Sequence, residues 1–159
     1  MQKNFVLYNS SAGTGKTFTL VKEYLKIVLK DNNSLRYRHI LAITFTNKAA
    51  SEMKERVLDA LKAFAGITEL KGTPKALYEV LLNPPKDERG IDITAEQLQK
   101  RSYKVLKSIL HNYNDFAIST IDKFTHKVIR TFAHDLQLPL NFNIELSDKE
   151  VLKSAIDML

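Results

Sequence analysis

The sequence predicts an α/β fold in which helices flank a parallel sheet, because short apolar runs alternate with longer helical patterns. Three runs read as buried strands, each followed by a helix: residues 4–9, 39–45 and 116–121. Strands that alternate with helices join through right-handed crossovers into a parallel sheet. Helices and turns at about 66–110 interrupt this alternation, and they predict a helical insertion.

The helices that follow the strands are predicted from apolar residues at three- and four-residue spacing. Residues 16–29 carry such a stripe at Leu20, Tyr24, Ile27 and Val28. Residues 47–64 carry one at Met53, Val57, Leu61 and Phe64, with Glu52 and Arg56 spaced to pair on the polar face. Residues 122–136 carry one at Phe124, Val128, Ile129 and Phe132.

The remaining segments are predicted from turn and capping signals. A short helix is expected at 75–82, and Thr94 with Gln97 forms a capping box that opens a helix to about residue 110. Residues 138–146 alternate loosely and suggest extended chain. Ser147 with Glu150 forms a second capping box that opens a helix running to 159, so residues 138–159 are expected to begin a further subdomain.

Composition limits the classes of function. The chain has 24 Lys and Arg against 18 Asp and Glu, a net charge of +6 that is compatible with a polyanionic partner. Cysteine is absent, which excludes disulfides and thiolate metal sites. The four histidines lack metal-ligand spacing. No apolar run reaches the ~20 residues that span a bilayer, and no signal peptide is recognised, so a cytoplasmic protein without membrane contact is expected.

Residues 9–17, NSSAGTGKT, have the composition of a phosphate-binding loop between a strand and a helix. Glycines let several backbone N–H groups converge on one anion at a helix N-terminus, a lysine reaches the terminal phosphates and a hydroxyl holds Mg²⁺. The candidate nucleotide-binding residues are Ser10, Ser11, Ala12, Gly13, Thr14, Gly15, Lys16 and Thr17. Ser10 stands where the standard pattern has glycine. The alternative is a glycine turn that leaves Lys16 and Thr17 on the surface.

A second polar motif follows the strand at 39–45. Its residues are Thr44, Phe45, Thr46, Asn47 and Lys48. Phe45 either offers an aromatic face to a nucleic-acid base or belongs to the core, and in the second case Thr46 or Asn47 only caps the helix. A basic helical face is also expected farther along the chain, at Lys123, Lys127, Arg130 and His134. This face either contacts DNA phosphates or is simply solvated.

Three ordered blocks carry a family resemblance. NSSAGTGKTFTLV and ITFTNKAASEMKERV resemble the first motifs of superfamily 1 DNA helicases of the UvrD/Rep type, and AISTIDKF resembles a third. The wording SAGTGKTFTL is especially similar to the RecB and AddA branch of helicase–nucleases. The resemblance implies a P-loop NTPase with a RecA-like parallel sheet, here incomplete, and makes residues 1–159 the N-terminal portion of the ATP-binding domain called 1A.

The resemblance also implies ligands. ATP and Mg²⁺ would be the cofactors, with Lys16 on the phosphates and Thr17 on the metal. Single-stranded DNA would be the macromolecular partner, and a helicase–nuclease partner subunit is expected. The candidate DNA contacts are Phe45, Thr46, Asn47, Lys48, Thr120 and Phe124, to which the basic face adds Lys127.

The sequence departs from the family pattern at two points. Asp122 stands where these helicases usually have histidine, and it is expected to cap a helix instead of contacting DNA. The acidic pair that activates water is missing, because Asp87–Glu88 lies in a proline-rich turn. The 159 residues are therefore expected to bind ATP weakly without turnover, while the full-length protein would couple ATP hydrolysis to 3′–5′ translocation along DNA and its unwinding. The alternatives are a nucleotide or small-molecule kinase and a non-catalytic module that binds single strands.

Overall fold

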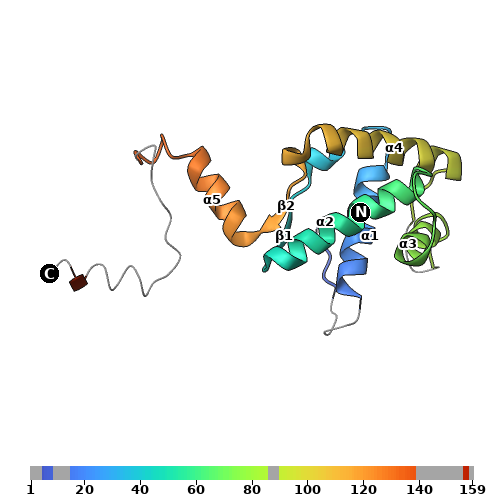
Figure 1. Cartoon of the computed structure of the whole chain (residues 1–159), viewed down its shortest axis with the longest axis horizontal. Coiled ribbons are helices and arrows are strands. Elements are labelled where there is room, and N and C mark those ends of the chain that lie inside the picture. The colour runs from blue at the N-terminus through green and yellow to red at the C-terminus, as the bar shows by residue number, and fades with distance from the viewer. Residues whose placement is uncertain (1–4, 9–14, 86–89, 139–155, 158–159) are drawn as a thin grey trace. The chain divides into compact units, whose positions relative to one another are not determined.

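The computed structural model describes residues 5–8, 15–85, 90–138 and 156–157. The chain divides into two compact units, residues 1–119 and residues 120–159. In chain order the first contains α1 (Lys16–Leu29), the 3-10 helix η1 (Arg36–His39), β1 (Ala42–Thr44), α2 (Asn47–Phe64), α3 (Gly72–Leu82), α4 (Ala95–His111) and the 3-10 helix η2 (Tyr113–Asp115) (Figure 1). Strand β2 (Ile118–Thr120) crosses the boundary and leads into α5 (Ile121–Thr131).

Strands β1 and β2 form a two-stranded sheet. The backbone N–H of Ala42 donates to the carbonyl of Ala117 at 3.0 Å, and the Thr44 hydroxyl lies 3.5 Å from the carbonyl of Ser119. Because the pairing advances in the same direction along both strands, the sheet is parallel, as predicted. Both strands are shorter than the predicted 39–45 and 116–121: residue 39 belongs to η1, and residue 121 is the first residue of α5.

The first predicted strand is wrong for the residues that the structure describes. Residues 5–8 have no regular secondary structure, and Phe5 and Leu7 are 78% and 79% exposed. A strand forms only where a neighbouring strand completes its backbone hydrogen bonds. In the described part of the chain the sheet pairs β1 with β2 alone. Residues 4 and 9 of the prediction lie outside the described residues.

The core of the first unit lies between α1, α2, α3 and α4. All four α2 residues of the predicted stripe, Met53, Val57, Leu61 and Phe64, belong to this core, and Ala60 and Ala63 join them. On α1 the buried face is rotated from the prediction: Val21, Tyr24, Leu25, Val28 and Leu29 are buried, whereas Leu20 and Ile27 are exposed. The apolar pattern on α1 fits either face, and the position of α1 against the other helices decides which one is buried.

Helices α3 and α4, from the predicted insertion, bury residues in the same core: Leu77, Leu81, Leu98, Val105, Leu106 and Ile109. Helix α3 starts at Gly72, three residues before the predicted 75. The capping box at the start of α4 is confirmed, since the Thr94 hydroxyl accepts from the N–H of Gln97 and the Gln97 side chain accepts from the N–H of Thr94. That residues 66–110 are an insertion stays a prediction.

In the second unit α5 ends at Thr131, so the predicted helix to residue 136 is five residues too long. No residue of α5 is buried, and Phe132, predicted on its apolar face, lies beyond the helix and is exposed. The predictions for residues 138–146 and 147–159 fall outside the described residues, except for Leu138 and for Ile156 and Asp157, which are helical.

Candidate functional site

Helix α1 opens directly after a glycine with a left-handed backbone. Gly15, at φ 81° and ψ 19°, is the N-cap residue, and its carbonyl accepts the N–H of Thr19 at 2.9 Å. A left-handed cap favours glycine because a side chain there is strained. An added Cβ would meet no atom within 4 Å, so the space beside this backbone is open. The sequence thus places glycine where the chain turns into the helix.

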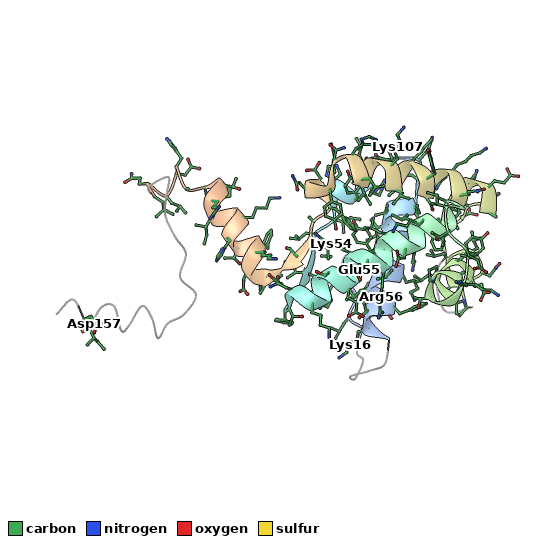
Figure 2. The ribbon with its side chains drawn as sticks, in the orientation of Figure 1. Lys16, Lys54, Glu55, Arg56, Lys107 and Asp157 are labelled. Atoms are coloured by element: carbon green, nitrogen blue, oxygen red, sulfur yellow. The ribbon has the colours of Figure 1, made fainter. Side chains whose placement is uncertain are left out.

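The start of α1 is suited to an anion. Its first turn contains no acidic residue, and the free N–H groups and the helix dipole there favour negative charge. Lys16 is exposed at this end of α1 (Figure 2). The next residue, Thr17, is half-buried. Residues 10–14 of the predicted loop lie outside the described residues. The described residues of the loop, Gly15 to Thr17, therefore form a helix start that favours negative charge.

The junction between β1 and α2 settles the interpretation of Phe45. Its side chain is 89% exposed, so the core alternative is wrong. Thr46 is the N-cap of α2, and its hydroxyl accepts from the N–H of Ala49 at 3.1 Å, as the capping alternative predicted. Asn47 and Lys48 are exposed in the first turn. An exposed aromatic ring beside a helix N-terminus is a surface that can stack a base.

In the second unit Thr120 is the N-cap of α5. It is buried, and its hydroxyl accepts from the N–H of Lys123 at 3.3 Å. The expected capping role of Asp122 is therefore wrong, since Asp122 lies two residues after the N-cap, in the first turn, where its negative charge interacts favourably with the helix dipole. Phe124 is half-buried and Lys127 is exposed. Thr120 therefore stabilises the start of α5 as its N-cap.

One face of α5 is basic. An open hollow of about 430 Å³ is lined by Lys123, His126, Lys127, Arg130 and Thr131. His126 was not predicted here, although it lies three residues after Lys123 and four before Arg130 on the same helical face. His134, which the prediction included, lies beyond the end of α5 and 3.8 Å from the carboxylate of Asp135. The basic face is therefore confined to the helix itself.

No group of three His, Asp or Glu residues in the described ranges is arranged to hold a metal ion. Among the same residues, none of the helices is long and apolar enough to cross a membrane.

The sequence matches a known family along its whole length. The family model of the UvrD/REP helicase N-terminal domain matches residues 1–159. The A subunit of the ATP-dependent helicase/nuclease from Clostridium kluyveri is 34% identical over 139 residues, which are 87% of this chain and 9% of the relative. The proteins of the same name from Bacillus cytotoxicus and Bacillus cereus are 28% and 31% identical over 152 residues, 95% of this chain and 10% of each relative.

The chain therefore spans about a tenth of the length of these curated relatives. No solved structure matches it. The relatives carry the name of the helicase–nuclease branch that residues 11–20, SAGTGKTFTL, predicted. Because the family model covers the whole sequence, the chain belongs to the UvrD/REP helicases and carries their N-terminal domain.

Proposed function

We propose that this chain is the nucleotide-binding and strand-contacting part of a DNA motor that couples ATP hydrolysis to movement along single-stranded DNA. The observation that carries the proposal is the start of α1, where Gly15 caps the helix, the first turn lacks acids, and Lys16 and Thr17 follow at once. Membership in the helicase family supports ATP as the nucleotide. Relatives named as helicase/nuclease subunits support a nuclease activity and a second subunit in the whole protein.

In this proposal the residues at 10–17 hold the nucleotide. Ser10 to Gly15 are assigned to the phosphates, Lys16 to neutralising the terminal ones, and the hydroxyl of Thr17 to Mg²⁺. Bound magnesium supplies charge neutralisation during phosphoryl transfer. The strand contacts are Phe45, Thr46, Asn47 and Lys48 in the first unit and Thr120, Phe124 and Lys127 in the second.

The nucleotide part is tested by ATP binding to the wild-type chain and to Lys16→Ala. We expect Lys16→Ala to weaken binding about tenfold or more, because it removes a charged hydrogen-bond donor from the phosphates. Lys30→Ala is the matched control, since Lys30 is an exposed lysine at the opposite end of the same helix. Equal ATP affinity for wild type and Lys16→Ala would refute the phosphate-loop assignment.

The strand part is tested by binding of labelled oligo-dT. We expect Phe45→Ala to weaken binding roughly fivefold or more, because base stacking on an aromatic ring is lost. We expect Lys127→Ala to reduce the slope of log K against log salt by about 0.7, the value for one phosphate contact on a single strand. The control is Lys75→Ala, an exposed lysine on α3. A slope that Lys127→Ala leaves unchanged would remove α5 from the strand path.

A further inference from the structure

The outer face of α4 carries a strip of exposed side chains that the proposed function does not use. Its members, called the α4 strip, are Lys100, Tyr103, Lys104 and Lys107, and all are exposed. The opposite face of α4 belongs to the core. Spacings of three and four residues place the strip on one side of the helix. In Figure 2 Lys107 stands on the side of α4 that faces away from α2.

The lysines of the α4 strip form no salt bridges with carboxylates of the described residues. No carboxylate in the described ranges lies within 4.0 Å of its lysine nitrogens, and Lys104 instead donates to the side-chain oxygen of Asn32 at 3.2 Å. The acidic residue of α4, Glu96, lies in the first turn, four residues before Lys100, so an acid neighbours the strip only at the N-terminal end of the helix.

Helix α2 shows the usual arrangement of a solvated face. There Arg56 pairs with Glu52, and Lys62 pairs with Asp59 at 3.4 Å. Exposed helix faces commonly mix both signs in this way. The α4 strip departs from that pattern, which indicates a surface suited to an anionic partner.

The spacing and the tyrosine indicate the kind of anion. At 1.5 Å per residue, Lys100 and Lys107 are about 10 Å apart along the helix axis, a length comparable to a few consecutive phosphates. Tyr103 lies between the lysines and is 53% exposed. An exposed aromatic ring among cations offers a stacking surface for a base, which an acidic peptide or a closed duplex does not use.

We infer that the α4 strip is a second contact for single-stranded nucleic acid, in which the lysines hold phosphates and Tyr103 stacks a base. The inference rests on the proposed function for the choice of DNA. It adds to that function a contact on a different element from the β1–α2 junction and from α5.

The lysines are tested by the salt dependence of oligo-dT binding. In the variant Lys100→Gln/Lys104→Gln/Lys107→Gln, the slope of log K against log salt should fall by about 2, since each phosphate contact on a single strand contributes about 0.7. The variant Lys62→Gln/Lys71→Gln/Lys75→Gln loses the same charge from α2, α3 and the segment before α3, and it should keep a nearly wild-type slope. Far-ultraviolet circular dichroism of both variants verifies folding.

The outcomes separate the inference from the proposed function. If the strip variant keeps the wild-type slope while Phe45→Ala weakens binding, the inference is wrong and the proposed function stands. If both triple variants lower the slope equally, only net charge matters and the inference is again wrong. If the wild-type chain binds no oligo-dT at low salt although Lys16→Ala weakens ATP binding, both strand assignments fail and the nucleotide assignment survives.

Tyr103 is tested by two substitutions at high salt, where phosphate attraction is weak. Tyr103→Leu should weaken oligo-dT binding roughly fivefold or more, whereas Tyr103→Phe should retain binding because the ring remains. Binding of a blunt duplex of equal length, or of poly-glutamate, should be the same for all three proteins. If Tyr103→Leu leaves oligo-dT binding unchanged, the strip is a general polyanion surface and its assignment to single strands is overturned.

Discussion

Tyr24 is a buried tyrosine whose hydroxyl has no hydrogen-bond partner among the described residues. Its ring packs edge-on against Phe116, with centroids 5.9 Å apart. Tyr37 contacts the same phenylalanine from another element, but its hydroxyl donates to the carbonyl of Ser108 at 3.0 Å. The two tyrosines therefore share one aromatic cluster and differ in whether the hydroxyl is satisfied.

We expect Tyr24→Phe to raise the free energy of unfolding by about 1 kcal/mol, because it removes a buried polar group that lacks a partner. Tyr37→Phe should lower the free energy of unfolding by about the same amount, because it breaks a hydrogen bond. Urea denaturation followed by circular dichroism measures both changes. Loss of stability in Tyr24→Phe would show that its hydroxyl is satisfied in solution.

Tyr24 should also make the stability of the fold depend on alkaline pH. Burial, and secondarily the neighbouring Tyr37, raise the pKa of Tyr24 above its ordinary value of 10.0. Above pH 10 the unfolded chain loses this proton while the folded chain keeps it, so the folded state binds more protons and stability falls as pH rises. The decline contributed by one such group is at most about 1.4 kcal/mol per pH unit. Urea unfolding at pH 9 and pH 11 measures this loss of stability. Between the two pH values the free energy of unfolding should fall less for Tyr24→Phe than for the wild-type chain. An equal fall in both proteins would contradict the raised pKa of Tyr24.

At the scale of elements, Arg101 joins α4 to the end of α1. Its Nη1 donates to the carbonyl of Leu29 at 2.9 Å and to that of Lys30 at 2.8 Å. The last carbonyls of a helix have no partner within the helix, so a cation there satisfies them and complements the helix dipole. The contact spans more than 70 residues of sequence.

We expect Arg101→Ala to lower the free energy of unfolding by about 1.5–3 kcal/mol, because two carbonyls lose a charged donor. Arg101→Lys should recover part of the loss, since an ammonium does not reproduce the planar fork of arginine. The control is Lys100→Ala, which changes the neighbouring exposed side chain on the same helix. Equal stability of Arg101→Ala and Lys100→Ala in urea would contradict this account of the contact.

How far the sequence predicts an element depends on the range of the interactions that form it. The capping box of Thr94 and Gln97 lies within four residues, and it is confirmed to the residue. The strand predicted at 4–9 depends on a neighbouring strand, and it is wrong where it is described. The contact of Arg101 with α1 leaves no local signal, so no pattern predicts it.

The same distinction holds for the candidate site. Gly15, Lys16 and Thr17 are positioned by one local turn, so their place at the start of α1 follows from sequence. The exposure of Phe45 depends on whether distant parts of the fold pack over its ring. The sequence alone therefore did not decide between a core position and an exposed one. The α4 strip is defined by the face of α4 that the core leaves exposed, and the tertiary packing determines that face.

At the scale of the whole molecule, the chain combines a nucleotide-suited helix start with a small sheet. The described sheet has two strands of three residues each. In the sequence the adjacent pair Asp87–Glu88 follows the residues NPPK and does not end an apolar run. ATP hydrolysis in P-loop enzymes requires an acid at the magnesium and a residue that orients water. We therefore propose that the residues of this chain bind the phosphates of ATP and do not by themselves complete the site for its hydrolysis.

We expect the 159-residue chain to bind ATP without hydrolysing it at rates near those of complete enzymes. Phosphate release should stay far below about 1 s⁻¹, the lower end of typical turnover numbers, with and without oligo-dT. Lys16→Ala provides the control, because any release that persists in this variant comes from a contaminating ATPase. Release at about 1 s⁻¹ or faster that disappears in Lys16→Ala would contradict the expectation, and it would mean that carboxylates within these 159 residues complete the active site.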